Sequence, residues 1–196
     1  WVEPDWTLQV QNLGLGCAQA EVWFSVAPGE AKTCEVLSIA PGDARSLRVG
    51  DCVDRAAGAW IRASQPVAVV ARLARDGHWA SYSGQGGGGS LQHLVLPRLG
   101  SALRVYVQDP WRTVAATVHL RVRDGDGADL LHREVQVAPH ETVLLRVTPE
   151  ELGAAADGPL SLVLESTREG LNPPASVIAV ALSEAVGDAG AIGAAW

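Results

Sequence analysis

The feature that most constrains this chain is an internal repeat, whose two copies lie on either side of the glycine-rich run at residues 84–90. The alternating segment 8–12 ends in a turn-forming Asn, as the segment 104–109 ends in Asp. The tripeptide 40–42 reads Ala-Pro-Gly and the tripeptide 138–140 reads Ala-Pro-His, each before another apolar segment. A spacing of roughly one hundred residues kept across such landmarks indicates a duplicated structural unit. We therefore expect two domains of one fold.

Length and composition fit this division. The chain has 196 residues, of which 47% are hydrophobic and 19% charged, so neither half has the composition of a disordered segment. Units of about 85 and 105 residues are large enough to form cores of their own. We expect a first domain at 1–83, a Gly/Ser linker at 84–90, a second domain at 91–185 and a small-residue, apolar tail at 186–196. The composition of the linker fits either a native flexible segment or an engineered one.

Short alternating segments separated by Gly- and Pro-containing turns predict an all-β fold. In the segment 18–26, every second residue is apolar, which is the period of a half-buried strand. Short strands at such regular spacing, with almost no helical periodicity, are typical of β-sandwiches. The predicted strands are 7–11, 18–26, 32–39, 45–49, 59–63 and 67–73 in the first half, and 103–107, 115–123, 130–137, 142–147, 160–165 and 176–182 in the second. A single helical turn is expected at 149–152.

Charge and hydropathy exclude several classes of protein. The net charge of -7, with arginines scattered rather than clustered, argues against a nucleic-acid partner, whose binders carry a basic stripe. The sequence contains no run of about twenty apolar residues, so it predicts no transmembrane helix. A chain that begins at Trp1 and contains no methionine fits a processed or fragmentary protein, and removal of a secretory leader is one way to produce it.

Three of the landmarks also carry a resemblance. The Val-Gln-Asn strand end at 10–12, the Ala-Pro-Gly turn at 40–42 and the Ser-Gln-Pro-Val strand at 64–70 resemble the tandem immunoglobulin-like modules of secreted and surface proteins in several bacterial groups. The resemblance implies two tandem immunoglobulin-like (fibronectin III-like) antiparallel β-sandwiches in an envelope or extracellular setting. Its motifs are turns and strand ends, so it implies no functional residues. The second copy departs from it at 172–174, where Asn-Pro-Pro lengthens a loop.

The three cysteines allow one disulfide and one odd thiol. Cys34 and Cys52 fall toward the same end of the predicted first sandwich and are the candidate pair, whereas Cys17 falls at the opposite end. Such a bridge would stabilise the fold by about 3 kcal/mol. The alternative is three buried free thiols, since no cysteine spacing matches a zinc site.

No motif of a catalytic or metal site is present. His119 and His132 are expected on an outward strand face, where Glu134 is more simply a cross-strand partner than a fellow metal ligand. The serines lie in no Gly-x-Ser-x-Gly elbow, and the glycines at 84–86 lack the Lys-Ser/Thr of a phosphate loop. We therefore predict no enzyme, no metal and no cofactor.

Aromatic residues are the candidates for recognition. Seven tryptophans accompany only one phenylalanine and two tyrosines. Trp23 and Trp60 lie in predicted strands and are assigned to packing. The others lie near ends or connections, where an exposed ring serves as an interface anchor or a sugar platform, or else plugs the end of a sandwich. These candidate contacts are Trp1, Trp6, Trp79, Tyr82, Trp111 and Trp196.

The tail at 186–196 suggests a second recognition mode, because a small apolar segment can add as a strand to a neighbouring subunit. The alternatives are a segment packed on its own domain and a processing remnant. The residues expected to act in assembly are Ala189, Ala191, Ile192, Ala194 and Trp196.

Together these features predict a secreted or cell-surface protein that acts as a non-enzymatic structural or adhesive module. Self-assembly into a surface layer or filament is part of this hypothesis, and the expected partners are copies of the chain or other envelope proteins. The alternative is a carbohydrate-binding module that stacks glycans on exposed Trp and Tyr.

Overall fold

The computed structural model describes residues 2–27, 30–75, 78–83, 91–109, 114–167, 177–183 and 194–195. These residues form an all-β protein, as the sequence predicts. The strands of the first half are β1 (Thr7–Asn12), β2 (Ala18–Ala27), β3 (Glu30–Ile39), β4 (Ala44–Arg48), β5 (Gly58–Ala63), β6 (Val67–Arg75) and β7 (His78–Ser83). The strands of the second half are β8 (Leu91–Leu96), β9 (Leu103–Gln108), β10 (Ala116–Asp124), β11 (Asp129–Val137), β12 (Thr142–Val147), β13 (Leu160–Thr167), β14 (Ile178–Ser183) and β15 (Ala194–Ala195).

Within the described residues, helical structure is confined to short segments between strands. They are α1 (Pro149–Leu152), η1 (Val49–Asp51) and η2 (Gly153–Asp157). Thr148 and Glu151 cap α1 reciprocally, and the main-chain N–H of Thr148 donates to the Glu151 carboxylate at 2.9 Å. None of the helices in the described ranges has the length and apolar character that crossing a bilayer requires.

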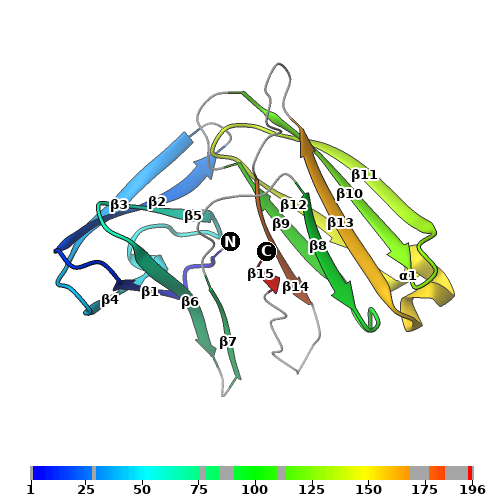
Figure 1. The fold of residues 1–196 in the computed structure, drawn as a ribbon, viewed down its shortest axis with the longest axis horizontal. Helices are drawn as coiled ribbons and strands as arrows, with labels where there is room; N and C mark the ends of the chain where they lie inside the picture. The colour runs from blue at the N-terminus through cyan, green and yellow to red at the C-terminus, as the bar shows by residue number, and fades with distance from the viewer. Residues whose placement is uncertain are drawn as a thin grey trace.

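Four antiparallel sheets divide evenly between the two halves, which lie side by side in Figure 1. The first half has the strand orders β4-β1-β6-β7 and β3-β2-β5. The second half has the orders β12-β9-β14-β15 and β11-β10-β13-β8. When β1 is matched to β9, β2 to β10 and so on to β6 and β14, the pairings are the same. The repeat found in the sequence is therefore a repeat of sheet topology.

Strand register fixes the correspondence between the halves residue by residue. Ala18 of β2 pairs with Ile39, and Ala116 of β10 pairs with Val137, so residues of β2 and β10 correspond at an offset of 98. The inward side chains of both strands are buried and alternate with outward ones. Each half has its own apolar core as a result; Phe24 lies in the first and Leu120 in the second.

Three strands are not predicted from the sequence: β7, β8 and the two-residue β15. β7 was expected to be a connection, yet it pairs with β6 over six residues and contains Trp79 and Tyr82. β8 follows the predicted linker and pairs with β13, about 70 residues away along the chain, with Leu96 opposite Leu160. Such long-range pairing leaves little local signature, because a six-residue strand is specified mainly by the sheet that receives it.

Candidate functional site

The halves meet at a stack of three rings. Trp23 and Trp60 are directly opposite each other on β2 and β5, on the outward face of their sheet. Their ring centroids are 6.2 Å apart with an interplanar angle of 9°. His140 of the second half lies on Trp60, with centroids 5.0 Å apart and an angle of 14°. We call these three rings the junction stack; it joins the outer face of one sandwich to a turn of the other.

The turn that carries His140 has an unusual backbone. The N–H of Glu141 donates to the carbonyl of Ala138 at 2.9 Å, and His140 has a φ of 61°. A proline at the second position of a four-residue turn and a positive φ at the third are typical of a type II turn, whose third residue is normally glycine. A side chain in this left-handed region costs roughly 1 kcal/mol. His140 is nevertheless 9% exposed, which is consistent with the ring being held by its contacts across the junction.

The first half has the same turn with the expected residue. There the N–H of Asp43 donates to the carbonyl of Ala40 at 3.1 Å, and Gly42 has a φ of 78°. No atom lies within 4 Å of the position that a Cβ on Gly42 would occupy. The two copies of the turn therefore differ at their third residue, Gly42 or His140, and at their fourth, Asp43 or Glu141. The histidine stands in the copy that faces the other half.

Gly58 allows the second half to approach closely beside the stack. A Cβ built on Gly58 would lie 1.9 Å from Thr142 Oγ1 and 2.9 Å from Gln108 Nε2. Thr142 and Gln108 are paired across β12 and β9, and neither of these two atoms has a hydrogen-bond partner in the ranges that the structure describes. A side chain at residue 58 would therefore require Thr142 to shift before the halves could pack as they do.

The backbone beneath the junction is tied down. The N–H of His140 donates to the carbonyl of Asp109 at 2.8 Å, and the N–H of Asp109 donates to that of Glu141 at 3.2 Å. A Glu141 carboxylate oxygen also accepts from the N–H of Ala138 at 2.7 Å. These hydrogen bonds fix the turn to the end of β9, so the backbone that carries the His140 imidazole is held in place.

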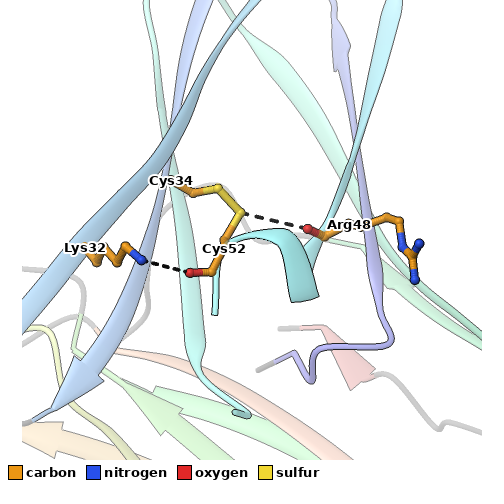
Figure 2. Close-up of a disulfide and its surroundings, with 4 residues drawn as sticks. All are labelled: Lys32, Cys34, Arg48 and Cys52. Carbon is orange, nitrogen blue, oxygen red and sulfur yellow. Dashed lines mark hydrogen bonds between the residues drawn. A yellow bond between two sulfur atoms is a disulfide. The ribbon is translucent and has the colours of Figure 1, made fainter. Parts of the chain in front are cut away.

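The disulfide predicted from the sequence is present and lies at one end of the first sandwich. Cys34 of β3 and Cys52, just after η1, are joined with their Cα atoms 5.3 Å apart (Figure 2). Lys32 Nζ donates to the carbonyl of Cys52 at 3.1 Å. Cys52 Sγ lies 3.9 Å from the carbonyl oxygen of Arg48, a van der Waals contact because a bonded sulfur has no proton to donate. Cys17 is exposed and free.

A hollow of about 600 Å³ adjoins the disulfide. Its lining combines cationic Lys32 and Arg55 with anionic Asp51 and Asp54. The Arg55 guanidinium also donates to the carbonyl of Val26. With both signs of charge on its walls, the hollow does not favour either a cation or an anion.

The structure corrects one of the predicted aromatic contacts. Trp6 is 5% exposed and belongs to the core of the first half, so it does not form an exposed platform. Burying its large apolar ring among the core side chains stabilises this position, and its main-chain carbonyl accepts from the N–H of Val49 at 2.9 Å. Trp79 and Tyr82 lie in β7 rather than in a connection. Trp1, Trp111 and Trp196 lie outside the described residues.

The described part of the predicted assembly tail pairs with its own chain. Ala194 and Ala195 form β15, opposite Ala181 and Val180 of β14. Figure 1 shows β15 on the side of β14 that faces β7. For these two residues the structure corresponds to the alternative in which the tail packs on its own domain. Ala189, Ala191, Ile192 and Trp196 lie outside the described residues.

The outward histidines of the second half form a surface cluster. His119 Nδ1 lies 3.5 Å from a carboxylate oxygen of Glu134, its predicted cross-strand partner, and the rings of His119 and His132 are 5.6 Å apart. Within the described ranges, no group of three His, Cys, Asp or Glu side chains is placed to hold a metal ion.

Hydrogen bonds lower the pKa of two exposed carboxyl groups. A hydrogen bond from Arg123 Nε to Asp129 Oδ1, 2.6 Å long, lowers the pKa of Asp129. A hydrogen bond from its own main-chain N–H, followed by one from Thr148, lowers the pKa of Glu150 in the first turn of α1. Both shifts favour the ionised form, as is usual for carboxylates with hydrogen-bond donors.

Comparisons with known proteins return only distant likenesses. No protein-family model and no curated protein matches the chain. A protein chain in the structure of an infectious bursal disease virus particle has 9% sequence identity to this chain and a TM-score of 0.25. The match covers 90% of this chain and 52% of the viral chain. A putative β-galactosidase from Bacteroides fragilis is 11% identical with a TM-score of 0.19, over 93% of this chain and 29% of that one. The chain thus spans about half the length of the viral protein, and similarity at this level carries no argument about function.

Proposed function

We propose that the chain is a non-enzymatic structural or adhesive module that acts outside the cytoplasm, built as a braced pair of immunoglobulin-like sandwiches. The observation that carries the proposal is the junction stack. Two flexibly linked domains would not require a histidine in a left-handed turn. A domain pair that resists bending requires contacts of this kind between its halves. The stack, the close approach at Gly58 and the braced turn together suit a part that transmits force or keeps a fixed shape.

The layer arrangement supports the immunoglobulin-like part of the proposal. Each half faces a four-stranded sheet against a sheet of three or four strands, all antiparallel, as immunoglobulin-like sandwiches do. The disulfide supports the location, because such bonds persist in oxidising compartments and are rare in the cytosol. A secreted or surface-displayed protein meets that condition.

Single-molecule stretching between the two chain ends tests the mechanical role. We expect two unfolding events, one for each sandwich, preceded by a smaller event in which the junction opens. Because the disulfide closes a separation of 18 residues, the first sandwich should release roughly 60 Å less contour length when oxidised than when reduced. Weakening the stack with Trp60→Ala should remove the early event alone. Unfolding without resolved events, at forces no higher than those of an unstructured chain, would rule out a load-bearing module.

Self-assembly is the part of the proposal that concerns partners. Light scattering should compare the full chain with a truncation that ends at residue 185. Large particles for the full chain and monomers for the truncation would assign assembly to the tail. Monomers in both cases would remove self-assembly and leave contacts with other envelope proteins.

A further inference from the structure

The first sandwich leaves exposed the end that the second sandwich uses at the junction. In the second half, the turn at 138–141 and the end of β9 pack on the outward face of β5, where His140 lies on Trp60. The residues of that turn are buried or half-buried. The matching turn of the first half, at 40–43, is exposed at all four residues. One copy of this end is therefore an interface, and the other faces solvent.

The loop beside the exposed turn presents two leucines. Leu13 is 59% exposed and Leu15 is 99% exposed. The segment 13–20, which contains both, has no charged residue, although the chain as a whole has a net charge of -7. Copies of an acidic chain repel one another, so an uncharged and apolar end is where two of them can meet at the lowest electrostatic cost.

Hydrogen bonds from a buried side chain hold this loop in one conformation. Asn12 is fully buried, its Nδ2 donates to the carbonyl of Gly16 at 2.7 Å, and its Oδ1 accepts from the N–H of Gly14 at 2.8 Å. The N–H of Leu13 donates to the carbonyl of Pro66 at 2.9 Å, which ties the loop to its neighbour. Because the loop is already ordered, docking of its leucines on a partner costs little conformational entropy.

The second half has an apolar patch on the face that corresponds to the receiving face of the first half. Leu91 and Val95 of β8 alternate with buried leucines, so they point outward, and they are 59% and 72% exposed. Val95 lies opposite Ser161 of β13, and by strand register Ser161 holds the place of Gly58. The patch therefore adjoins the position at which, in the first half, the neighbouring sandwich makes its closest approach.

We propose that copies of the chain join head to tail, with Leu13 and Leu15 of one copy docked on Leu91 and Val95 of the next. The contact repeats between copies the end-on-face arrangement that joins the halves within a copy. It is aliphatic rather than aromatic, because the exposed turn has Gly42 where the other turn has a ring. Each added copy leaves one end and one face free, so growth continues into a filament unless the rotation closes a ring. This inference rests on the self-assembly part of the proposed function.

Light scattering at chain concentrations up to about 1 mM measures the association. The end variant carries Leu13→Ser and Leu15→Ser, and the face variant carries Leu91→Ser and Val95→Ser. Each should raise the dissociation constant between copies by about tenfold or more, because it removes the apolar side chains of one partner surface. The matched control is Leu144→Ser, which changes a leucine of β12 that is 48% exposed, and it should leave the constant within about twofold.

A mixture of the end variant and the face variant tests the head-to-tail geometry, because each protein keeps the surface that the other lacks. Each variant alone should be monomeric, and the mixture should form dimers that do not grow. All proteins carry Cys17→Ser, since the exposed thiol could otherwise link copies covalently.

The chain that ends at residue 185 keeps both surfaces and should still assemble. Native-sized particles from either double variant, no dimer in the mixture, monomers of the parent chain at about 1 mM, or assembly lost only on truncation would each overturn the proposal. Stretching of single chains requires no assembly, so none of these results would refute the mechanical role.

Discussion

Replacing His140 by glycine is the most informative perturbation of the junction, because it has two opposing effects. It relieves the backbone cost of a side chain at a φ of 61°, and it removes the ring that lies 5.0 Å from Trp60. The first effect stabilises by roughly 1 kcal/mol. The second destabilises by about 0.5 to 1.5 kcal/mol, the range of stacked aromatic pairs. We therefore expect His140→Gly alone to change the free energy of unfolding by less than about 1 kcal/mol.

The effects separate in a double-mutant cycle with Trp60→Ala. Once the tryptophan is absent, only strain relief remains, so His140→Gly should stabilise the Trp60→Ala variant by roughly 1 kcal/mol. The coupling energy between the two positions should then be about 1 kcal/mol. Urea unfolding, followed by both tryptophan fluorescence and far-UV circular dichroism, measures all four proteins. A coupling energy within about 0.3 kcal/mol of zero would refute the claim that the stack holds the halves together.

Gly42 supplies the matched control. Gly42→His places the same side chain in the corresponding turn of the first half, where the space around the Cβ is open. Strain without a stacking partner should destabilise that half by roughly 1 to 2 kcal/mol. A neutral result would show that the turn accepts histidine without cost, and the argument from strain at His140 would fail with it.

Three further changes test other parts of the structure. Gly58→Ala should destabilise the junction by about 1 to 3 kcal/mol through its clash with Thr142, and adding Thr142→Ala should recover part of the loss in thermal unfolding. Replacing both disulfide cysteines with serine should lower the free energy of urea unfolding by about 3 kcal/mol; an unchanged midpoint would contradict it. The stability from the lowered pKa of Asp129 is complete above its ordinary value of 3.8 and lost as pH falls through the lowered one, so Asp129→Asn should weaken the acid dependence of the urea midpoint.

Much of the fold could be predicted because its determinants are local. Alternation in β2 and β10 sets which side chains are buried, and the turns at 40–42 and 138–140 set where strands begin. The same alternation placed His119 opposite Glu134, and the position of the cysteines near one end of the sandwich identified the Cys34–Cys52 pair.

The junction could not be predicted, because it depends on how two complete sandwiches lie against each other. From the sequence, Trp23 and Trp60 are ordinary strand residues, and Trp6 is open between an exposed contact and a ring that plugs the end of a sandwich; the structure buries it. One signal was available in the repeat itself: a histidine stands where the other copy has glycine at a turn position that favours glycine. A departure of this kind between copies points to a requirement from outside the unit.

The difference between the two turns makes the contact between the halves asymmetric. At the positions of Trp23 and Trp60, the second half has Arg121 and Val163, which lie opposite each other across β10 and β13. A third copy appended after the second would find no aromatic surface on which to place its turn. The two units are therefore not interchangeable: the first offers the aromatic face that receives the ring, and the second offers the ring that is inserted.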